Sequence, residues 1–192
     1  MDKYIEKAKV REAEYEVNEL FVNRWSPRAM TGEVLDENEV NTLFEAARWA
    51  PSSMNNQPWR FLISKRNDSY WNTYFNLLME GNKVWCKDAS HLIVVVSKKT
   101  LENGNEYPTH SFEAGSAWQN LALQASLMNV VVHGMGGFDY EKAKDVLNIP
   151  DDYRVEMMIA IGKYNKELSD EKQEKISGRK SLNELVFKGK FD

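Results

Sequence analysis

The segment Pro51–Trp59 combines ligand-binding side chains with a stiff backbone. It reads Pro-Ser-Ser-Met-Asn-Asn-Gln-Pro-Trp, with two hydroxyls and three consecutive side-chain amides between two prolines. Each proline fixes its own φ and disfavours helix in the residue before it, so the loop should be extended and rigid. Side-chain amides can donate to and accept from the edge of a heterocycle. The alternative is a turn whose Ser and Asn side chains satisfy only local backbone groups.

Arginines in two distant segments suggest an anion site. Arg24 and Arg28 flank the turn at Ser26, and Arg179 lies far along the chain in a glycine-containing loop. A guanidinium stays charged at every relevant pH and can bind phosphate through two parallel hydrogen bonds. Solvated surface arginines would give the same pattern. The polar loop at 51–59 favours the phosphate interpretation.

The pair Gly136-Gly137 follows a short apolar strand, Val130–Val132. Open α/β sheets place ligands at such strand ends, and glycine lets backbone amides approach a flat ring without a Cβ in the way. The alternative is a tight turn between strand and helix, and the run is not the G-x-G-x-x-G dinucleotide fingerprint. We interpret His133 as a packed histidine and Cys86 as a buried small hydrophobe.

Composition excludes several classes of protein. The chain has 192 residues, 42% of them hydrophobic and 28% charged, and a net charge of −4. These values predict one ordinary globular domain over residues 1–192 and no nucleic-acid interface. No apolar run approaches the roughly 18 residues that span a membrane, and no signal peptide is evident, so we expect a cytoplasmic protein. One cysteine and three scattered histidines predict neither a disulfide nor a metal site.

Apolar periodicity predicts helices alternating irregularly with about four short strands, which indicates a mixed sheet flanked by helices. The expected strands are 60–64, 91–97, 130–132 and 155–161. The strand at 91–97 should be buried on both faces, because it contains five consecutive apolar residues. The expected helices are 36–50, begun by an Asp36–Glu39 capping box, then 69–79, 111–129 and 140–147.

The two ends of the chain are highly charged. Residues 1–16 should form a peripheral helix that continues to about residue 22, with Val17, Leu20 and Phe21 facing the core. The segment 163–192 is polar until a late apolar cluster. The helix at 111–129 is apolar nearly all round, which fits either the centre of a dimer or a central core helix.

Taken together, these motifs make the sequence resemble the FMN-dependent nitroreductase family over about residues 20–187. The resembling segments, in order, are Arg24-x-Ser26-x-Arg28, Glu45–Ser53 continuing through Asn55 to Trp59, Asn82 with Trp85 and Asp88-Ala89, Gln119-Asn120-Leu121, Gly134–Asp139, and Arg179. The resemblance implies a three-layer α/β/α fold of the α+β class, with a largely antiparallel sheet. Some relatives carry lysine at the Ser177 position and glutamate at the Gly136 position.

The resemblance also implies a role for each residue of the site. Arg24, Ser26 and Arg28 would hold the phosphate and ribityl oxygens of FMN, and Arg179 would complete the phosphate clamp. Asn82, Gly136 and Gly137 would lie at the flavin ring. The ring of the partner subunit's flavin would be lined by one further set of residues, Pro51, Ser52, Ser53, Asn55 and Gln57. The expected assembly is therefore a homodimer with its flavin sites at the interface, completed by the segment 163–192.

The activity implied by this resemblance is electron transfer from NADH or NADPH, through the flavin, to a small organic acceptor such as a nitroaromatic or a quinone. Both substrates would use one place in turn, which gives ping-pong kinetics, and no catalytic side chain is required. A specialised relative, either a reductive dehalogenase or a flavin-fragmenting enzyme, is an alternative. A flavin-binding protein without catalysis is another.

Overall fold

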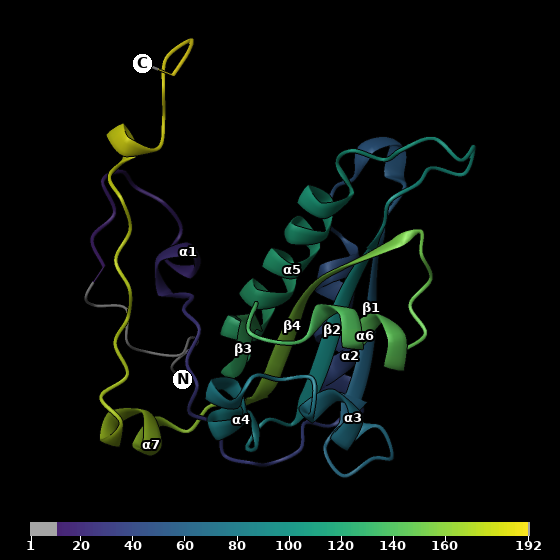
Figure 1. The fold of residues 1–192 in the computed structure, drawn as a ribbon. Coiled ribbons are helices and arrows are strands. Elements are labelled where there is room, and N and C mark those ends of the chain that lie inside the picture. The colour runs from purple at the N-terminus through teal and green to yellow at the C-terminus, as the bar shows by residue number, and fades with distance from the viewer. Residues whose placement is uncertain (1–10, 192) are drawn as a thin grey trace.

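The computed structural model describes residues 11–191, and a four-stranded antiparallel sheet forms its centre (Figure 1). The sheet has the order β1-β2-β4-β3, and each neighbouring pair is antiparallel. The strands are β1 (Trp59–Lys65), β2 (His91–Lys98), β3 (Val130–Met135) and β4 (Tyr153–Lys163). All four predicted strands are present, and each is longer than its apolar run. The predicted α+β class is confirmed.

Strand β2 is buried on both faces, as its five consecutive apolar residues predict. Side chains of a strand point alternately to opposite faces. Leu92, Val94 and Val96 accordingly lie in one hydrophobic cluster, whereas Ile93 and Val95 lie in a second cluster on the other side of the sheet. The sheet therefore separates two cores, and each core needs its own layer of helices.

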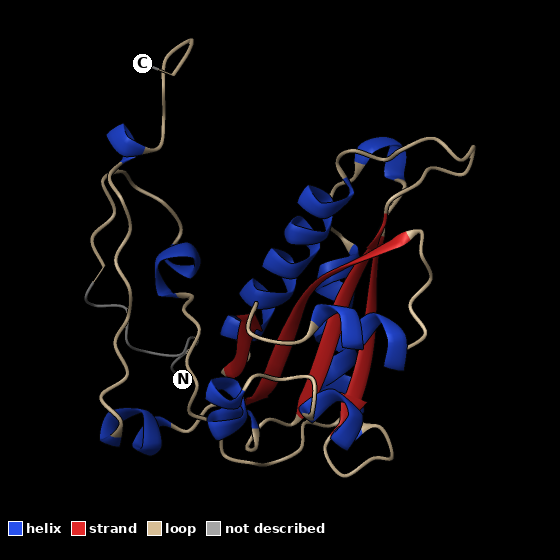
Figure 2. Ribbon diagram, in the orientation of Figure 1, coloured by secondary structure: helices blue, strands red, loops and turns tan. Residues whose placement is uncertain are grey.

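Two sets of helices supply these layers (Figure 2). One face is covered by α2 (Glu37–Arg48) and α5 (His110–Leu127). The other face is covered by three short helices, α3 (Trp71–Phe75), α4 (Glu80–Cys86) and α6 (Tyr140–Val146). The three-layer α/β/α arrangement is thus confirmed. The capping box is also present, since the Asp36 carboxylate accepts from the Glu39 N–H at 2.8 Å and the Glu39 carboxylate accepts from the Asp36 N–H at 2.8 Å.

The predicted single helix over 69–79 is wrong. Helix α3 ends at Phe75, and α4 begins only at Glu80. Between them, Leu78 forms an antiparallel bridge with Phe138, and the Met79 N–H donates to the Gly137 carbonyl at 3.1 Å. These tertiary hydrogen bonds replace the helical ones that the periodicity of Tyr70, Tyr74 and Leu77 predicts.

The predicted N-terminal helix is also wrong where the structure describes it; residues 1–10 lie outside the described part. Residues 11–18 are not helical, and α1 (Glu19–Asn23) has only five residues. Val17 and Phe21 do not face the core, because 51% and 58% of their surfaces are exposed. The segment follows the C-terminal part of the chain instead: the Leu182 N–H donates to Glu14 at 3.0 Å.

The C-terminal segment leaves the sheet after β4 and forms α7 (Lys166–Glu171) and a short 3-10 turn, Leu182–Glu184. Figure 1 shows this segment running beside α1, apart from the helices that cover the sheet. We refer to residues 172–191 as the C-terminal arm. Within the described chain, no helix has the length and apolarity needed to cross a membrane.

Burial of His91 predicts a pH dependence of stability. Its Nδ1 lies 2.8 Å from Ser90 Oγ, and that oxygen accepts from the Leu35 N–H at 2.7 Å, so the Ser90 hydroxyl can donate to a neutral imidazole. Burial, with the nearby Lys65 charge as a smaller cause and Asp68 opposing, lowers the pKa of His91 from 6.5 to about 4. The unfolded chain therefore binds a proton below pH 6.5 that the folded protein accepts only near pH 4.

We expect the free energy of unfolding to fall as the pH falls from about 6.5 towards 4. In His91→Asn this fall should be smaller than in the parent, because one difference in proton uptake is removed. Urea unfolding at pH 7, 6 and 5 measures both slopes. Equal slopes in the two proteins would contradict the assignment.

Candidate functional site

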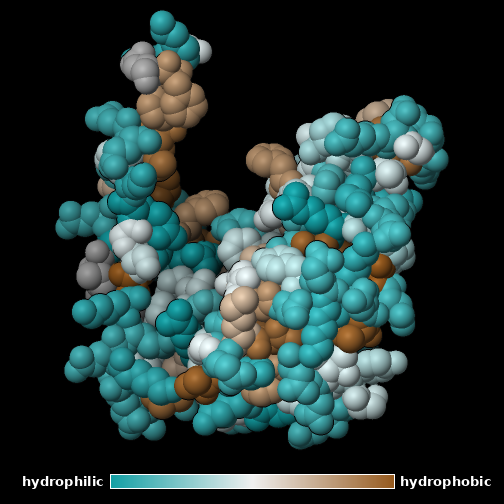
Figure 3. Space-filling model, in the orientation of Figure 1, coloured by the Kyte–Doolittle hydropathy of each residue, from teal (hydrophilic) through white to brown (hydrophobic). Residues whose placement is uncertain are grey.

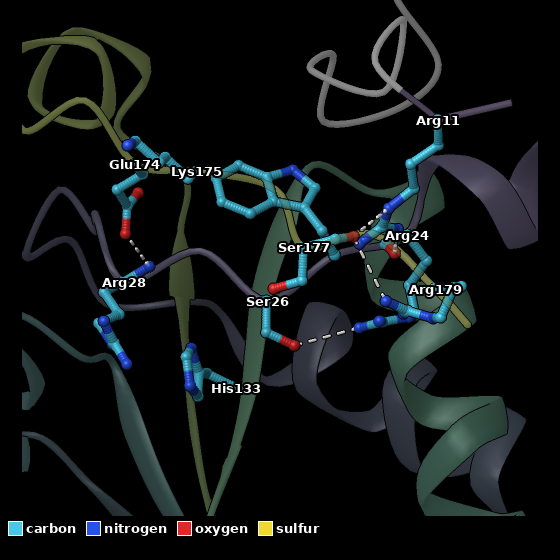
Figure 4. Close-up of a pocket in the computed structure, with 10 residues that line it drawn as sticks. Arg11, Arg24, Ser26, Arg28, His133, Glu174, Lys175, Ser177 and Arg179 are labelled. Carbon is cyan, nitrogen blue, oxygen red and sulfur yellow. Dashed lines mark hydrogen bonds between the residues drawn. The ribbon is translucent and has the colours of Figure 1, made fainter.

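A cationic pocket of about 420 Å³ lies where both ends of the described chain meet β3 (Figure 4). It contains Arg24, Arg28 and Arg179, which the sequence predicts as one anion site, and Ser26, which the family resemblance adds to it. Arg24 and Ser26 come from the segment after α1, and the Arg24 Nη1 donates to Ser26 Oγ at 3.1 Å. The remaining lining residues are Arg11, Trp25, His133, Glu174, Lys175 and Ser177. The structure therefore brings together the four residues of the predicted clamp.

Positive charge in this pocket is crowded and poorly neutralised. Burial lowers the pKa of Arg24, and the neighbouring guanidiniums of Arg179 and Arg11 lower it further. Burial and Arg179 likewise lower the pKa of Arg11. The single carboxylate in the lining, Glu174, is already used by the backbone, accepting from the Arg28 N–H at 2.7 Å. A bound anion would relieve this repulsion, and a phosphate group fits such a donor set.

Arg11, like Glu174 and Lys175, lines this pocket without having been identified from the sequence. Its Nη1 donates to the carbonyls of Val22 at 3.0 Å and Arg24 at 2.9 Å, and its Nε donates to the Ser177 carbonyl at 2.9 Å. Arg11 thus holds the segment before Arg24 against the C-terminal arm. Nothing in its sequence context distinguishes it from the other charged residues nearby, so no sequence signal would have found it.

Helix α4 lies beside the pocket, next to His133 of β3. The Arg28 guanidinium carbon lies 5.9 Å from the centre of the Trp85 ring, and the Trp85 and His133 rings are 4.7 Å apart. His133 Nδ1 lies 3.1 Å from the Pro27 carbonyl oxygen, so this nitrogen is the donor. Burial is the largest cause that lowers the pKa of His133, which favours the neutral ring. His133 is thus packed against Trp85, as interpreted from the sequence, and its hydrogen-bond partner Pro27 is distant in sequence.

Asn82 and Gly137, two further predicted site residues, contact each other directly. Asn82 Nδ2 donates to the Gly137 carbonyl at 2.9 Å, and a Cβ on Gly137 would lie 2.8 Å from that same nitrogen. This close approach is one physical reason for glycine at position 137. At Gly136 a Cβ would meet only the Tyr140 hydroxyl, at 3.5 Å. Because Asn82 lies one turn before Trp85 on α4, this cluster adjoins the cationic pocket.

The polar loop Pro51–Trp59 lies elsewhere in the same chain. It contacts the first turn of α5, where the Ser53 N–H donates to Glu113 at 3.0 Å, and Figure 1 shows this end of α5 to be distant from α4. Asn55 and Gln57 line a separate pocket of about 430 Å³ with residues of the 98–110 loop. None of the five predicted loop residues, Pro51, Ser52, Ser53, Asn55 and Gln57, lines the cationic pocket. One chain alone does not bring the loop and the arginines together.

One solved structure and two sequence relatives indicate that the protein is an oxidoreductase. A solved structure described as an oxidoreductase containing FMN superimposes with a TM-score of 0.88 at 40% sequence identity, covering 95% of this chain and 96% of that one. Protein DrgA of Synechocystis is 30% identical over 182 residues, with 79% of this chain and 85% of the relative covered. An oxygen-insensitive NADPH nitroreductase of Helicobacter acinonychis is 29% identical over 171 residues, covering 68% and 79%.

The family follows from the sequence profile of the nitroreductase family, which matches residues 22–84 and 64–163. These overlapping matches span most of the chain and include all four strands of the sheet. The chain belongs to the nitroreductase family and is an oxidoreductase. The resemblance drawn from the motifs is therefore confirmed.

The crowded guanidiniums predict anion-dependent stability. Inorganic phosphate at millimolar concentration should raise the Tm of the flavin-free protein by a few degrees, because it binds the folded state only. Arg179→Ala should abolish most of this rise. Without phosphate, the same variant should be at least as stable as the parent, since it removes a like charge beside Arg24.

Lys180→Ala is the matched control, because it removes a neighbouring positive charge that does not line the cationic pocket. Its phosphate-dependent rise in Tm should equal that of the parent. Differential scanning calorimetry gives these values. An equal rise in Arg179→Ala and the parent would contradict the assignment of Arg179 to the anion site.

Proposed function

We propose that this protein is an FMN-dependent oxidoreductase that carries electrons from NADH or NADPH to a small organic acceptor. The observation that carries this proposal is the set of guanidiniums of Arg11, Arg24 and Arg179, which line one pocket with His133 of β3 and without a free carboxylate. Two relatives support it, one solved structure described as containing FMN and one protein named an NADPH nitroreductase.

Each segment of the site has a distinct part in binding. Arg24, Arg28 and Arg179 would hold the phosphate group, and Ser26 would add a hydroxyl for the phosphate or ribityl oxygens. Gly136 and Gly137 would present backbone groups to the ring, with Asn82 fixing the Gly137 carbonyl. When bound, FMN supplies the redox chemistry by accepting hydride from the reduced nicotinamide and passing electrons on to the acceptor.

The chain's own residues then bind, orient and exclude water, and none is needed as an obligate acid or base. We propose that the nicotinamide and the acceptor use the same open face in turn, which makes the kinetics ping-pong. A nitroaromatic, a quinone or a similar planar acceptor fits a shared face of this kind. The fold does not select among them, because one scaffold hosts many substrates.

A homodimer would unite the two halves of the site. Since the 51–57 loop does not line the cationic pocket of its own chain, we propose that it covers the flavin of a partner subunit. Large apolar side chains are exposed on α5, beside the loop and on the C-terminal arm: Phe112 at 80%, Trp49 at 71% and Phe187 at 45%. Figure 3 shows an open notch between the C-terminal arm and the rest of the molecule. A second copy would cover this apolar surface.

The C-terminal arm contributes both to the cationic pocket and to the proposed dimer surface. It carries Arg179 into the cationic pocket and then continues through four partly exposed apolar side chains, Leu182, Leu185, Val186 and Phe187, whose exposed fractions are 42%, 56%, 64% and 45%. We propose that residues 163–192 complete both the flavin site and the dimer, within one domain that spans the chain.

The decisive experiment is an anaerobic titration of the flavin-loaded protein with NADH and, separately, NADPH. We expect each effective nicotinamide to abolish the absorbance of the oxidised flavin at ~450 nm, and a quinone or a nitroaromatic to restore it. Bound flavin that neither nicotinamide bleaches would instead indicate a flavin-binding protein without reductase activity. A colourless protein that does not bind added FMN would contradict both readings.

Arg28→Ala should weaken FMN retention far more than it harms folding. The exposed Arg28 side chain has little part in the core, whereas its loss removes charge-assisted hydrogen bonds worth roughly 1.5–3 kcal/mol to the phosphate. Flavin content after gel filtration and Tm without flavin are the two measurements. Arg154→Ala, an exposed arginine on β4, is the matched control. Equal flavin content in Arg28→Ala and the parent would remove Arg28 from the clamp.

A further inference from the structure

Glu113, in the first turn of α5, is unusual in being a buried carboxylate. Only 5% of its surface is exposed, and among residues 11–191 it is the only Asp, Glu, Lys or Arg that is buried. Burying an ionised group is unfavourable unless hydrogen bonds replace its hydration. Its partners are all uncharged: the Ser53 N–H at 3.0 Å, Thr109 Oγ1 at 2.7 Å and the Tyr107 hydroxyl. An ion pair within the described chain therefore does not explain this carboxylate.

The loop that Glu113 contacts has an unfavourable backbone. Met54, Asn55 and Gln57 have φ values of +51°, +57° and +48°, a region that non-glycine residues rarely adopt. Such residues persist only where surrounding contacts fix them. Inside the loop, the Gln57 N–H donates to Ser52 Oγ at 3.0 Å. This bond lies within the loop and does not attach it to α5.

The Ser53 peptide provides that attachment. Its N–H donates to Glu113 Oε1, and its carbonyl oxygen lies 3.3 Å from the Tyr107 hydroxyl, which itself donates to Glu113 Oε2. Burial and the hydrogen bond to Glu113 raise the pKa of Tyr107 to about 12, so this hydroxyl remains a donor at every working pH. Tyr107 and Thr109 both belong to the 98–110 loop. One carboxylate thus joins α5, the 51–57 loop and the 98–110 loop.

We propose that Glu113 is a positioning residue that holds the 51–57 loop in the conformation that faces the flavin ring, and that it ties the 98–110 loop to the same conformation. This inference rests on the proposed function, in which the 51–57 loop is one wall of the flavin site. Glu113 acts through Ser53 and does not touch the flavin or the substrates.

Glu156 provides a matched control for Glu113. It is also a largely buried carboxylate at this end of the molecule, with 16% of its side chain exposed, and it also accepts from hydroxyls, those of Ser97 and Ser111. It makes no hydrogen bond to residues 51–59. A variant of Glu156 therefore reports what the loss of a buried carboxylate does to the fold without disturbing the loop.

The test compares Glu113→Gln, Tyr107→Phe and Glu156→Gln with the parent protein. The Kd for FMN is measured on the flavin-free protein by quenching of flavin fluorescence, and hydrogen exchange of the Ser53 amide is measured without flavin. In Glu113→Gln, the Kd and the exchange rate should each rise about tenfold or more, because a hydrogen bond to a charged acceptor is lost. Tyr107→Phe should change both in the same direction by less. Glu156→Gln should leave both within about twofold of the parent.

Unchanged FMN affinity in Glu113→Gln would overturn the proposal, even with faster exchange, since the loop would then be held for another purpose. Equal effects of Glu113→Gln and Glu156→Gln would overturn it too, because they would indicate a general loss of stability. If Glu113→Gln does not fold, Tyr107→Phe decides by the same criteria. If the parent does not bind FMN, the proposed function fails, and the exchange rate of Ser53 alone decides whether Glu113 fixes the loop.

Discussion

Repulsion among guanidiniums is the constraint on which the site depends. Arg11, Arg24 and Arg179 come from opposite ends of the described chain, and burial together with the neighbouring Arg179 charge lowers the pKa of both Arg24 and Arg11. Arg11 donates to the carbonyls of Arg24 and Ser177, and Arg179 donates to the carbonyl of Gly178, whereas Arg24 donates to Ser26 Oγ. Such an arrangement is unfavourable for the protein alone. An anion would neutralise this charge, so the meeting of the two chain ends and the proposed phosphate binding would support each other.

The rest of the fold places a ring-binding surface next to this charge. Buried strand β2 fixes the sheet, and the sheet directs β3 so that His133 lies in the cationic pocket while Gly136 and Gly137 lie a few residues further on. Helix α4 spans the same distance, with Trp85 beside His133 and Asn82 bonded to Gly137. The proposed phosphate and ring sites are therefore adjacent in one chain. The amide loop does not line the cationic pocket, which is why the proposed site needs a second subunit.

The sheet, helix α2 and the grouping of three arginines could be predicted from the sequence, because each has a recognisable sequence signal. The strands and α2 were predicted because apolar runs and a capping box are local signals. The meeting of Arg24, Arg28 and Arg179 in one pocket was expected from guanidinium chemistry and from the family resemblance. Arg11 and Glu113 were not predicted, since their roles come from hydrogen bonds to residues distant in sequence. Within the described residues, the helices expected at 11–16 and 69–79 were wrong for the same reason. Pairing with the C-terminal arm and with Gly137 outweighed local helix propensity.

The central claim is that the arginine pocket binds the phosphate of a flavin mononucleotide, and the most direct measurement compares FMN with riboflavin. The two ligands share the ring and the ribityl chain and differ only in the phosphate. We predict that the flavin-free protein binds riboflavin at least about 100-fold more weakly than FMN, because two or more charge-assisted hydrogen bonds are missing. Equal affinity for the two ligands would contradict the account.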